Sequence, residues 1–432
     1  MSQFAKKSHK YSWAKRFVIA VVIAFFLVRA LLAPAPAPIY LPSPYAIGVP
    51  DKSWTFSEYI DDSRQRLLAL VQEYYLESDP QHFGDKYTLD RVVDMRSPFE
   101  VFGSASDCEA SSSNKRIGFL LLHGLTDSPY YLREIASGLS TRFPCSLSRA
   151  ILFPGHGTVP GDTLSVEWQD WELAAKFGIE SLRSEVDELY IVGFSMGSTV
   201  ALLYADQHRE DELLKGLLLL SPAVRAKNEL AYLSPYAKWF QKWLGQEEER
   251  DAARYESFST NAGAEFYLLA RQTEAKDFEP LDLPVFMAGT IDDETVNFEA
   301  SISFFCERTT SDKRHMIVYQ AQSNVVHNSC DGMEIVQANM PENRVVSISH
   351  TGVTNSAADA HYGFDADFSN CLHYGRGTQL YDRCMNDDSA TVYAERNLMA
   401  DEAYADKLIR RGSFNPHLEP LMNEMSDFIR GL

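Results

Sequence analysis

The sequence predicts an α/β fold, in which a mostly parallel sheet is flanked by helices and carries a helical cap insertion. Short apolar runs alternate with longer amphipathic segments, and the runs lack the polar alternation of half-exposed strands. Glycine or a polar residue follows nearly every run. Ligands of open α/β sheets bind beyond the carboxyl ends of the strands, so functional residues are expected there. The expected strands are residues 117–122, 148–153, 189–192, 217–220, 284–288 and 344–349.

The first 33 residues are predicted to be a membrane anchor or a signal segment. They hold six bases and no acid, and an apolar run spans residues 17–28. Prolines crowd the possible cleavage sites, which favours an uncleaved anchor in the inner membrane with the body outside the cytoplasm. Cleavage followed by secretion is the alternative. Residues 34–52 then form a Pro-rich stalk, and residues 53–432 form one domain.

The charge of the chain bears on its partners. Sixty acidic residues face forty basic ones, for a net charge of -20, and no basic stripe offsets this excess. Such a surface repels phosphate backbones, so nucleic-acid binding is not expected. The composition leaves the oligomeric state open.

The six cysteines fit an oxidising compartment, because none has CxxC or metal-ligand spacing. Fifteen pairings are possible for six cysteines. Cys371 and Cys384 are close enough in sequence to close a local loop, and free buried thiols are the alternative. The aspartate-rich loop around them lacks EF-hand spacing and is interpreted as a solvated loop, so no metal site is expected.

Helices are expected between the strands. Residues 54–77 should form an amphipathic helix, because Thr55 and Glu58 have capping-box spacing and Leu67, Leu70 and Val71 supply an apolar face. Residues 223–281 interrupt the strand–helix alternation with many aromatic and charged residues. We interpret them as a cap over the site, the alternative being helices whose aromatic residues only pack on the core. Further helices are expected at residues 198–208, 298–305 and 416–429.

Ser195 is the predicted catalytic nucleophile. It lies in Gly193-Phe194-Ser195-Met196-Gly197, between an expected strand and an expected helix, which is the form of a nucleophile elbow. Two backbone N–H groups should complete an oxyanion hole. We assign them to Met196, which follows the nucleophile, and to Leu125, in the loop 123–129 after an earlier strand. His123 and Gly124 shape that loop.

The acid and the base should follow later strands, in the order nucleophile, acid, base. Asp293 is the first choice as acid because it lies at the apex of the loop after residues 284–288, and Asp292 is the reserve. His350 directly follows the expected strand 344–349 and is the predicted general base. His361, in the long polar loop that follows, is the reserve.

Together these motifs resemble the bacterial carboxylesterase and monoacylglycerol lipase group of α/β-hydrolases, often grouped with serine aminopeptidase-like hydrolases. The matching pieces are residues 123–129, 154–157, 193–197 and 293–297, with His350. The resemblance implies a Ser195–His350–Asp293 triad and favours Asp293 over Asp292. It covers roughly residues 115–350 and the last helix. The first hundred residues lie outside it, and about eighty follow His350 where a few dozen are usual.

The resemblance implies hydrolysis of a small carboxylic ester or a lipid-like ester through an acyl-enzyme, without a metal or organic cofactor. A peptidase, an amidase or a thioesterase on the same fold is the alternative enzyme. An inactive, membrane-tethered binding protein is the alternative from another class, and it predicts the loss of a triad residue.

Overall fold

The computed structural model describes residues 16–17, 35–110, 115–321, 326, 329–400 and 402–432. The predicted anchor at residues 1–33 therefore lies outside the described residues, apart from residues 16 and 17. Within the described ranges, no helix combines the length and the apolar character needed to cross a membrane.

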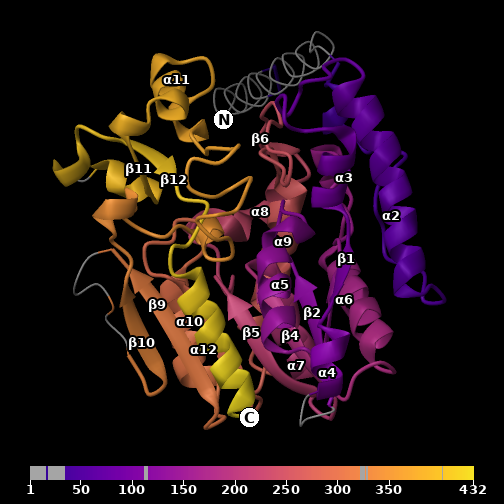
Figure 1. The fold of residues 1–432 in the computed structure, drawn as a ribbon. Helices are drawn as coiled ribbons and strands as arrows, with labels where there is room; N and C mark the ends of the chain where they lie inside the picture. Colours follow the sequence, from indigo (N-terminus) through magenta and orange to yellow (C-terminus); the bar gives the residue numbers. More distant parts are fainter. Residues whose placement is uncertain (1–15, 18–34, 111–114, 322–325, 327–328, 401) are drawn as a thin grey trace, which may run out of the picture.

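An eight-stranded sheet forms the centre of the molecule and confirms the predicted fold class (Figure 1). Its strand order is β1-β3-β2-β4-β5-β8-β9-β10. The edge strand β1 is antiparallel to β3, and all other neighbours are parallel. The strands are β1 (Phe99–Phe102), β2 (Ile117–Leu122), β3 (Ser146–Ala150), β4 (Glu188–Phe194), β5 (Leu214–Leu220), β8 (Val285–Thr290), β9 (Arg314–Gln320) and β10 (Met333–Gln337).

Helices cover both faces of this sheet. Side chains of β2 alternate between two cores: Leu121 packs on the side of α5 and α12, whereas Leu120 and Leu122 pack on the side of α6, α7 and α10. Burial on both faces explains why the strand reads as an uninterrupted apolar run. The helices are α5 (Arg133–Arg142), α6 (Trp168–Leu182), α7 (Met196–Gln207), α10 (Phe298–Arg308) and α12 (Leu418–Arg430), with α3 (Leu89–Arg96) and α4 (Ala105–Ala110) before the sheet's second strand.

The predicted first helix is present as α2 (Phe56–Val71), continued by the π-turn η2 (Gln72–Leu76). The capping box is formed as expected: the Thr55 side chain accepts the amide N–H of Glu58, and the Glu58 carboxylate accepts the amide N–H of Thr55. Phe56 and Tyr59 anchor the helix against Phe177 of α6. Sequence-local capping and burial of the apolar face thus fix the same helix.

The segment between β5 and β8, predicted as a helical cap at residues 223–281, contains helices and also a two-stranded ladder that the sequence did not predict. A short antiparallel ladder joins β6 to β7 ahead of the one long helix, α9. The elements are η5 (Glu229–Leu233), α8 (Ser234–Ala237), β6 (Trp243–Gly245), β7 (Phe258–Ser259) and α9 (Thr260–Thr273).

The predicted strand at residues 344–349 was also wrong, because β10 occupies that edge of the sheet. Val345 instead makes isolated bridges with Met340 and Tyr393, so this segment pairs with the chain that follows His350. We call residues 353–417 the C-terminal extension. Its two strands, β11 (Thr391–Ala394) and β12 (Leu408–Arg411), pair in parallel. Its helices and turns are η8 (Leu372–Tyr374), α11 (Gln379–Asn386), η9 (Asp388–Ala390), η10 (Arg396–Ala400) and η11 (Glu402–Tyr404).

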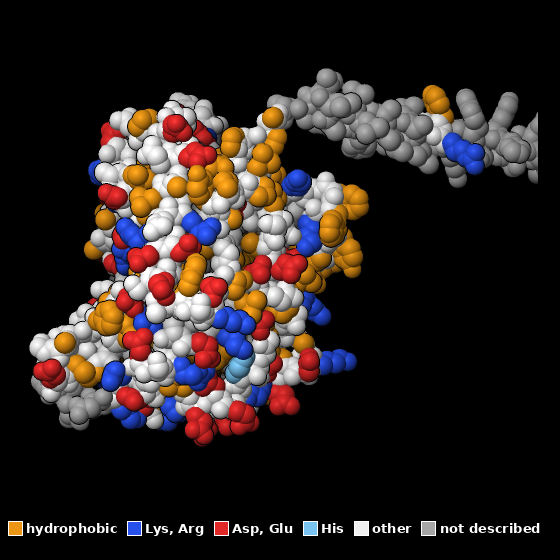
Figure 2. Space-filling view, turned by 90° about the vertical axis from the view of Figure 1, so that its right-hand side faces the viewer, with side chains coloured by type: hydrophobic (Ala, Val, Ile, Leu, Met, Phe, Trp, Pro, Cys, Tyr) orange, Lys and Arg blue, Asp and Glu red, His pale blue; other side chains and the backbone are white. Residues whose placement is uncertain are grey.

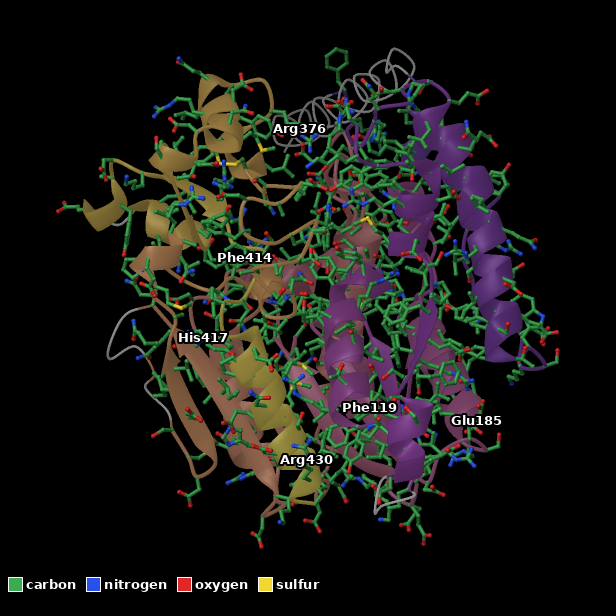
Figure 3. All side chains as sticks on the ribbon, viewed as in Figure 1. Phe119, Glu185, Arg376, Phe414, His417 and Arg430 are labelled. Carbon is green, nitrogen blue, oxygen red and sulfur yellow. A yellow bond between two sulfur atoms is a disulfide. The ribbon has the colours of Figure 1, made fainter. Side chains whose placement is uncertain are left out.

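Short 3-10 turns complete the described chain. They are η1 (Pro38–Tyr40), η3 (Pro129–Leu132), η4 (Pro160–Leu164), η6 (Pro341–Asn343) and η7 (His350–Gly352). In Figure 3, Glu185 and Arg430 lie at the amino-terminal edge of the sheet, whereas Phe414 and Arg376 lie beyond its carboxyl edge. The C-terminal extension therefore occupies the side on which functional residues were expected.

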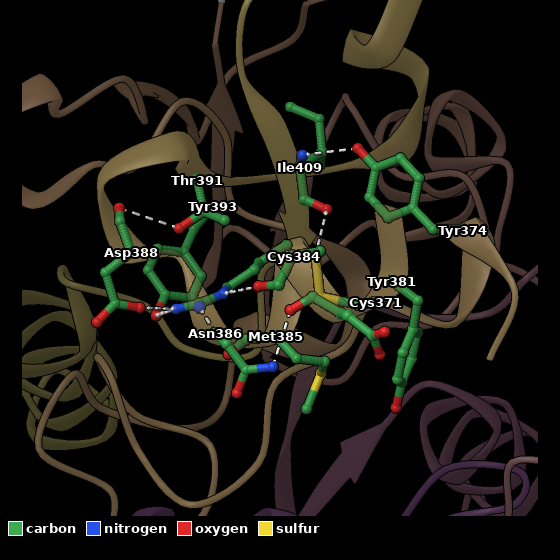
Figure 4. The surroundings of a disulfide bond; sticks show 12 residues. Cys371, Tyr374, Tyr381, Cys384, Met385, Asn386, Asp388, Thr391, Tyr393 and Ile409 are labelled. Carbon is green, nitrogen blue, oxygen red and sulfur yellow. Dashed lines mark hydrogen bonds and ion pairs between the residues drawn. A yellow bond between two sulfur atoms is a disulfide. The ribbon is translucent and has the colours of Figure 1, made fainter. Parts of the chain in front are cut away.

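All six cysteines are paired, so the alternative of free thiols was wrong. The disulfides are Cys108–Cys145, Cys306–Cys330 and Cys371–Cys384, the last of which confirms the predicted local loop. Figure 4 shows this bridge between α11 and the turn before η8, against the backbone of β12. The disulfide sulfur of Cys384 contacts the Ile409 carbonyl oxygen at 3.5 Å. Cross-linking a loop on this strand limits the conformations open to the unfolded extension.

Replacing both Cys371 and Cys384 with serine should lower the free energy of unfolding by about 3 kcal/mol, because the unfolded chain is then no longer restricted to conformations in which this loop is closed. The measurement is the urea-unfolding transition under non-reducing conditions, followed by tryptophan fluorescence. An unchanged transition midpoint would contradict a stabilising role for this bridge.

Candidate active site

Ser195 lies at a sharp turn between β4 and α7. Its backbone has φ 53° and ψ -118°, a left-handed conformation that is strained for a residue with a side chain. The flanking glycines are required by close backbone contacts. A Cβ at Gly193 would lie 2.5 Å from Ser198 Cα, and one at Gly197 would lie 2.0 Å from the carbonyl oxygen of Leu122. The pentapeptide thus forms the predicted elbow for steric reasons.

The structure brings Ser195, His350 and Asp293 together. His350 Nε2 lies 2.9 Å from Ser195 Oγ, and His350 Nδ1 lies 2.6 Å from Asp293 Oδ2. All three residues are buried. A carboxylate accepts at Nδ1 only when that nitrogen carries the proton, which leaves Nε2 free to accept the serine proton.

Asp293 is fixed by its own loop. Its second oxygen, Oδ1, accepts the amide N–H groups of Thr295 and Val296 at 2.7 and 2.8 Å. With both oxygens engaged, the carboxylate has one orientation and Oδ2 faces the imidazole. The loop register therefore determines which of the two adjacent aspartates reaches the histidine.

The two reserve residues lie elsewhere. Asp292 Oδ2 accepts the amide N–H of Ala321 at 2.8 Å, on the other side of the loop, and burial raises the pKa of this carboxyl. His361 is buried between Asp251 and Tyr87, with Nε2 2.9 Å from Asp251 Oδ1. Among the described residues, neither contacts Ser195; Asp292 and His361 bind other partners.

The loop after β2 lies beside the nucleophile. Leu125 lines the same cavity as Ser195, and Met196 begins α7 directly after it. His123 is completely buried, and its Nε2 accepts the amide N–H of Phe153 at 3.0 Å. Burial and the neighbouring His156 lower the pKa of His123 well below its ordinary value, so it stays neutral. This histidine holds the loop to β3, in keeping with the structural role assigned to it.

A cavity of about 540 Å³ opens onto Ser195 and His350. Its walls differ in character. Residues between β5 and β8 supply apolar side chains, among them Leu230, Leu233, Leu244, Phe258 and Phe266, and the polar lining residues include Thr126, Asp127, Arg254, Thr295 and Arg411. A mostly apolar cavity with a few polar groups suits a ligand that carries both characters.

Sequence reasoning missed the charged residues of this cavity. Asp127 sits inside the recognised motif at residues 123–129, but the motif gave no reason to expect a buried carboxyl. Burial raises the pKa of Asp127 to about 6, although Arg254, 3.9 Å away, opposes this rise. Its Oδ1 atom has no hydrogen-bond partner within the described part of the chain. Arg254 and Arg411 come from segments in which the sequence showed no motif.

One group of side chains in the described residues has ligand atoms close enough to hold a metal ion, namely His315, Glu334 and Glu424. These residues come from β9, β10 and α12 and do not line the cavity at Ser195. This cluster therefore lies apart from the candidate catalytic residues Ser195, His350 and Asp293.

Comparison with known proteins defines the class. The family described as alpha/beta hydrolase fold matches residues 119–352, more than half of the chain, and the chain belongs to this family. Over 131 residues it is 28% identical to the thermostable monoacylglycerol lipase of Bacillus sp. (strain H-257), which covers 30% of this chain and 49% of that enzyme. The chain thus spans about half the length of this curated relative.

Solved structures resemble the chain at lower identity. A structure described with LipS and LipT, two metagenome-derived lipolytic enzymes, aligns with a TM-score of 0.42 and 20% identity, over 51% of this chain and 86% of that one. The Saccharomyces cerevisiae monoglyceride lipase, solved with a substrate analog, gives a TM-score of 0.40 and 15% identity, over 52% and 82% of the two chains.

Replacing Asp127 with asparagine should stabilise the protein at pH 8 and leave its stability unchanged at pH 4. A carboxyl whose pKa is raised on folding binds more protons in the folded state, so stability is lost as pH rises from about 4 to about 6. The asparagine variant avoids this loss, which amounts to about 3 kcal/mol at most. Thermal melts of both proteins at the two pH values measure it, and equal differences at both would contradict the assignment.

Proposed function

We propose that this chain is a serine hydrolase that cleaves carboxylic esters through a covalent acyl-enzyme. The observation that carries the proposal is the continuous line of hydrogen bonds from Asp293 through His350 to Ser195, at the mouth of a partly apolar cavity. The same three residue types, in the order Ser, Asp, His, serve acyl transfer in hydrolases with a nucleophile elbow.

In the proposed reaction His350 Nε2 takes the proton from Ser195 Oγ as this oxygen attacks the ester carbonyl carbon. Asp293 keeps the proton on Nδ1 and stabilises the imidazolium that forms. The amide N–H groups of Leu125 and Met196 bind the oxyanion. His350 then gives its proton to the leaving alcohol, and a water molecule, activated by the same nitrogen, releases the acid and restores the serine.

The cavity supports an ester with an apolar acyl group. Leu230, Leu244 and Phe266 would contact that group, and the alcohol would contact polar lining residues such as Asp127. The name of the relative from Bacillus, a monoacylglycerol lipase, agrees with an amphipathic ester of this kind. Amide and thioester cleavage use the same side chains and are the alternative reactions. An inactive binding protein is not favoured, because it predicts the loss of a triad residue, whereas Ser195, His350 and Asp293 are all present.

We also propose that the chain is exported and tethered to the membrane by residues 1–33, with secretion after cleavage as the alternative. Three disulfides support an oxidising compartment. Just after the Pro-rich repeat, the ring of Tyr40 lies 5.4 Å from that of Trp243, and its hydroxyl donates to the Glu247 carbonyl. Trp239 and Phe240, which are exposed, shortly precede Trp243 in the sequence. Figure 2 shows hydrophobic side chains gathered mostly in the upper half of one face of the molecule. Such surfaces are typical of contact with lipid or protein.

A fluorophosphonate probe should label the wild-type protein, and Ser195→Ala should abolish the labelling. The probe reacts covalently with a serine that an adjacent base activates. Intact-protein mass spectrometry measures one adduct per chain. Ser137→Ala, at an exposed serine of α5, is the control and should label like the wild type.

The same preparations are assayed on oxygen esters of increasing acyl length and on matched amides and thioesters. Oxygen esters should react fastest. Preferential amide cleavage would replace the ester proposal by a peptidase or amidase, and an unlabelled wild type would refute a serine hydrolase altogether.

Matched substitutions should separate the assigned acid and base from their reserves. Asp293→Asn and His350→Ala should each lower kcat for a p-nitrophenyl ester by at least about a thousandfold, because either change disrupts proton transfer from Ser195. Asp292→Asn and His361→Ala should keep kcat within about tenfold of wild type. Circular dichroism checks folding, and a larger loss from either reserve variant would reverse the assignment.

A further inference from the structure

The C-terminal extension builds a second, small parallel arrangement that ends at His350. The segment before the histidine runs beside β11: the amide of Tyr393 donates to the Arg344 carbonyl at 2.7 Å, and the amide of Val346 donates to the Tyr393 carbonyl at 2.8 Å. Strand β12 lies on the other side of β11 and is parallel to it. Because parallel strands end at one edge, the residues that end β11 and β12 lie next to the histidine.

Glu395, which follows β11, is completely buried and holds the backbone of His350. Its Oε1 atom accepts the amide N–H of His350 at 3.0 Å. Arg411, the last residue of β12, binds the same carboxylate through two nitrogens, with distances of 3.0 and 2.9 Å. The amide of Glu395 itself donates to Ser347 Oγ at 2.9 Å. The carboxylate is therefore held from two sides.

Arg411 also reaches the loop of the catalytic acid. Its Nη2 atom donates to Thr295 Oγ1 at 2.6 Å, and the amide of that threonine donates to Asp293 Oδ1. A single ion pair thus contacts the backbone of the proposed base at one end and the loop of the proposed acid at the other. The spacing between these two chain segments sets the hydrogen bond between His350 and Asp293.

The two faces of β12 have separate tasks. Arg410 donates to the Cys384 and Met385 carbonyls, beside the disulfide and away from Glu395. Arg411 points toward Glu395 and the cavity. Alternation along a strand places neighbouring residues on opposite faces. The disulfide-bonded part of the extension therefore anchors the strand that supplies Arg411.

We propose that Glu395 and Arg411 are positioning residues that hold His350 between Asp293 and Ser195, so that the C-terminal extension is part of the active site. This inference rests on the proposed hydrolase function. A buried ion pair costs desolvation and often adds little net stability, so geometry is the stronger reason for one at this place. Burial raises the pKa of Glu395, but Arg411 and the histidine amide outweigh it and hold the pKa below its ordinary value.

Three variants test the proposal at different points. Glu395→Gln keeps an oxygen for the His350 amide but removes the charge. Arg411→Lys keeps the charge but loses the two-pronged contact. Thr295→Val removes only the acceptor of Arg411 and leaves the backbone N–H that binds Asp293. Glu256→Gln is the matched control, because Glu256 is a buried carboxylate that pairs with Arg376 at 2.7 Å rather than with His350 or Arg411.

The measurements are kcat and KM for a p-nitrophenyl ester from pH 5 to 9, normalised to active sites titrated with fluorophosphonate. Each of the three variants should lower kcat by at least about tenfold and change KM by less than threefold. Glu395→Gln should also move the acid limb of kcat/KM to lower pH, because a negative charge near the imidazolium is lost. Asp293 and Asp127 also act on this imidazole, and Arg411 interacts with Asp293; all three are unchanged in that variant. Thr295→Val changes no charge and should leave the limb in place.

Glu256→Gln should lower the unfolding midpoint about as much as Glu395→Gln does, and should leave kcat within twofold of wild type. Normal turnover per active site in Glu395→Gln and Thr295→Val, with an active wild type, would overturn the positioning role alone. Equal losses in Glu256→Gln would do the same. Should Glu395→Gln fail to fold, Thr295→Val and Arg411→Lys still decide the question. A wild type that neither labels nor hydrolyses esters would overturn the proposed function and this inference with it.

Discussion

The hydrogen bond between Asp293 and His350 is the contact on which the rest of the site depends. It joins two segments more than fifty residues apart in sequence, and each must be placed to within a few tenths of an ångström. The acid is fixed by the end of β8 and by the amides of its own loop. The base has no strand of the main sheet before it. Its position comes from the strands of the C-terminal extension, so the fold uses two different supports for the two halves of one contact.

The parts of the site that belong to the main sheet could be predicted from the sequence, because short-range rules determine them. The Ser195 elbow follows from steric limits on Gly193 and Gly197, and the pentapeptide alone shows that both positions are glycine. Buried parallel strands appear in the sequence as apolar runs, and the loop after one of them holds Asp292 and the proposed acid, Asp293. The expected strand at residues 344–349 was wrong, although the histidine after it lies where a base is needed. Its apolar residues pack against β11 rather than β10, and no local pattern distinguishes these two partners.

Glu395, Arg411 and Asp127 could not be predicted for a related reason. Each is a charged residue in a polar stretch, where the ordinary expectation is exposure to solvent. For Glu395 and Arg411, burial follows from pairings between distant segments, namely β11 with β12 and β11 with residues 344–346. Sequence periodicity carries no information about such contacts. The long stretch after His350 signalled only that something unusual follows the base.

Charged side chains surround His350. Asp293, Glu395 and Asp127 supply three carboxyls near it, and Arg411 and Arg254 supply two guanidinium groups. With all five ionised, the net charge of these side chains is negative by one, which would balance the positive charge that forms on the imidazole during the proposed reaction. Fixed charges that favour an ion formed only during the reaction lower the barrier without binding the substrate more tightly. In the proposed reaction the imidazole starts neutral with its proton on Nδ1, so Asp293 must orient the ring while Nε2 stays free to accept the serine proton. A carboxylate held in one orientation meets this requirement. The requirement therefore depends on the relative placement of Asp293 and His350, which Glu395 and Arg411 are proposed to support.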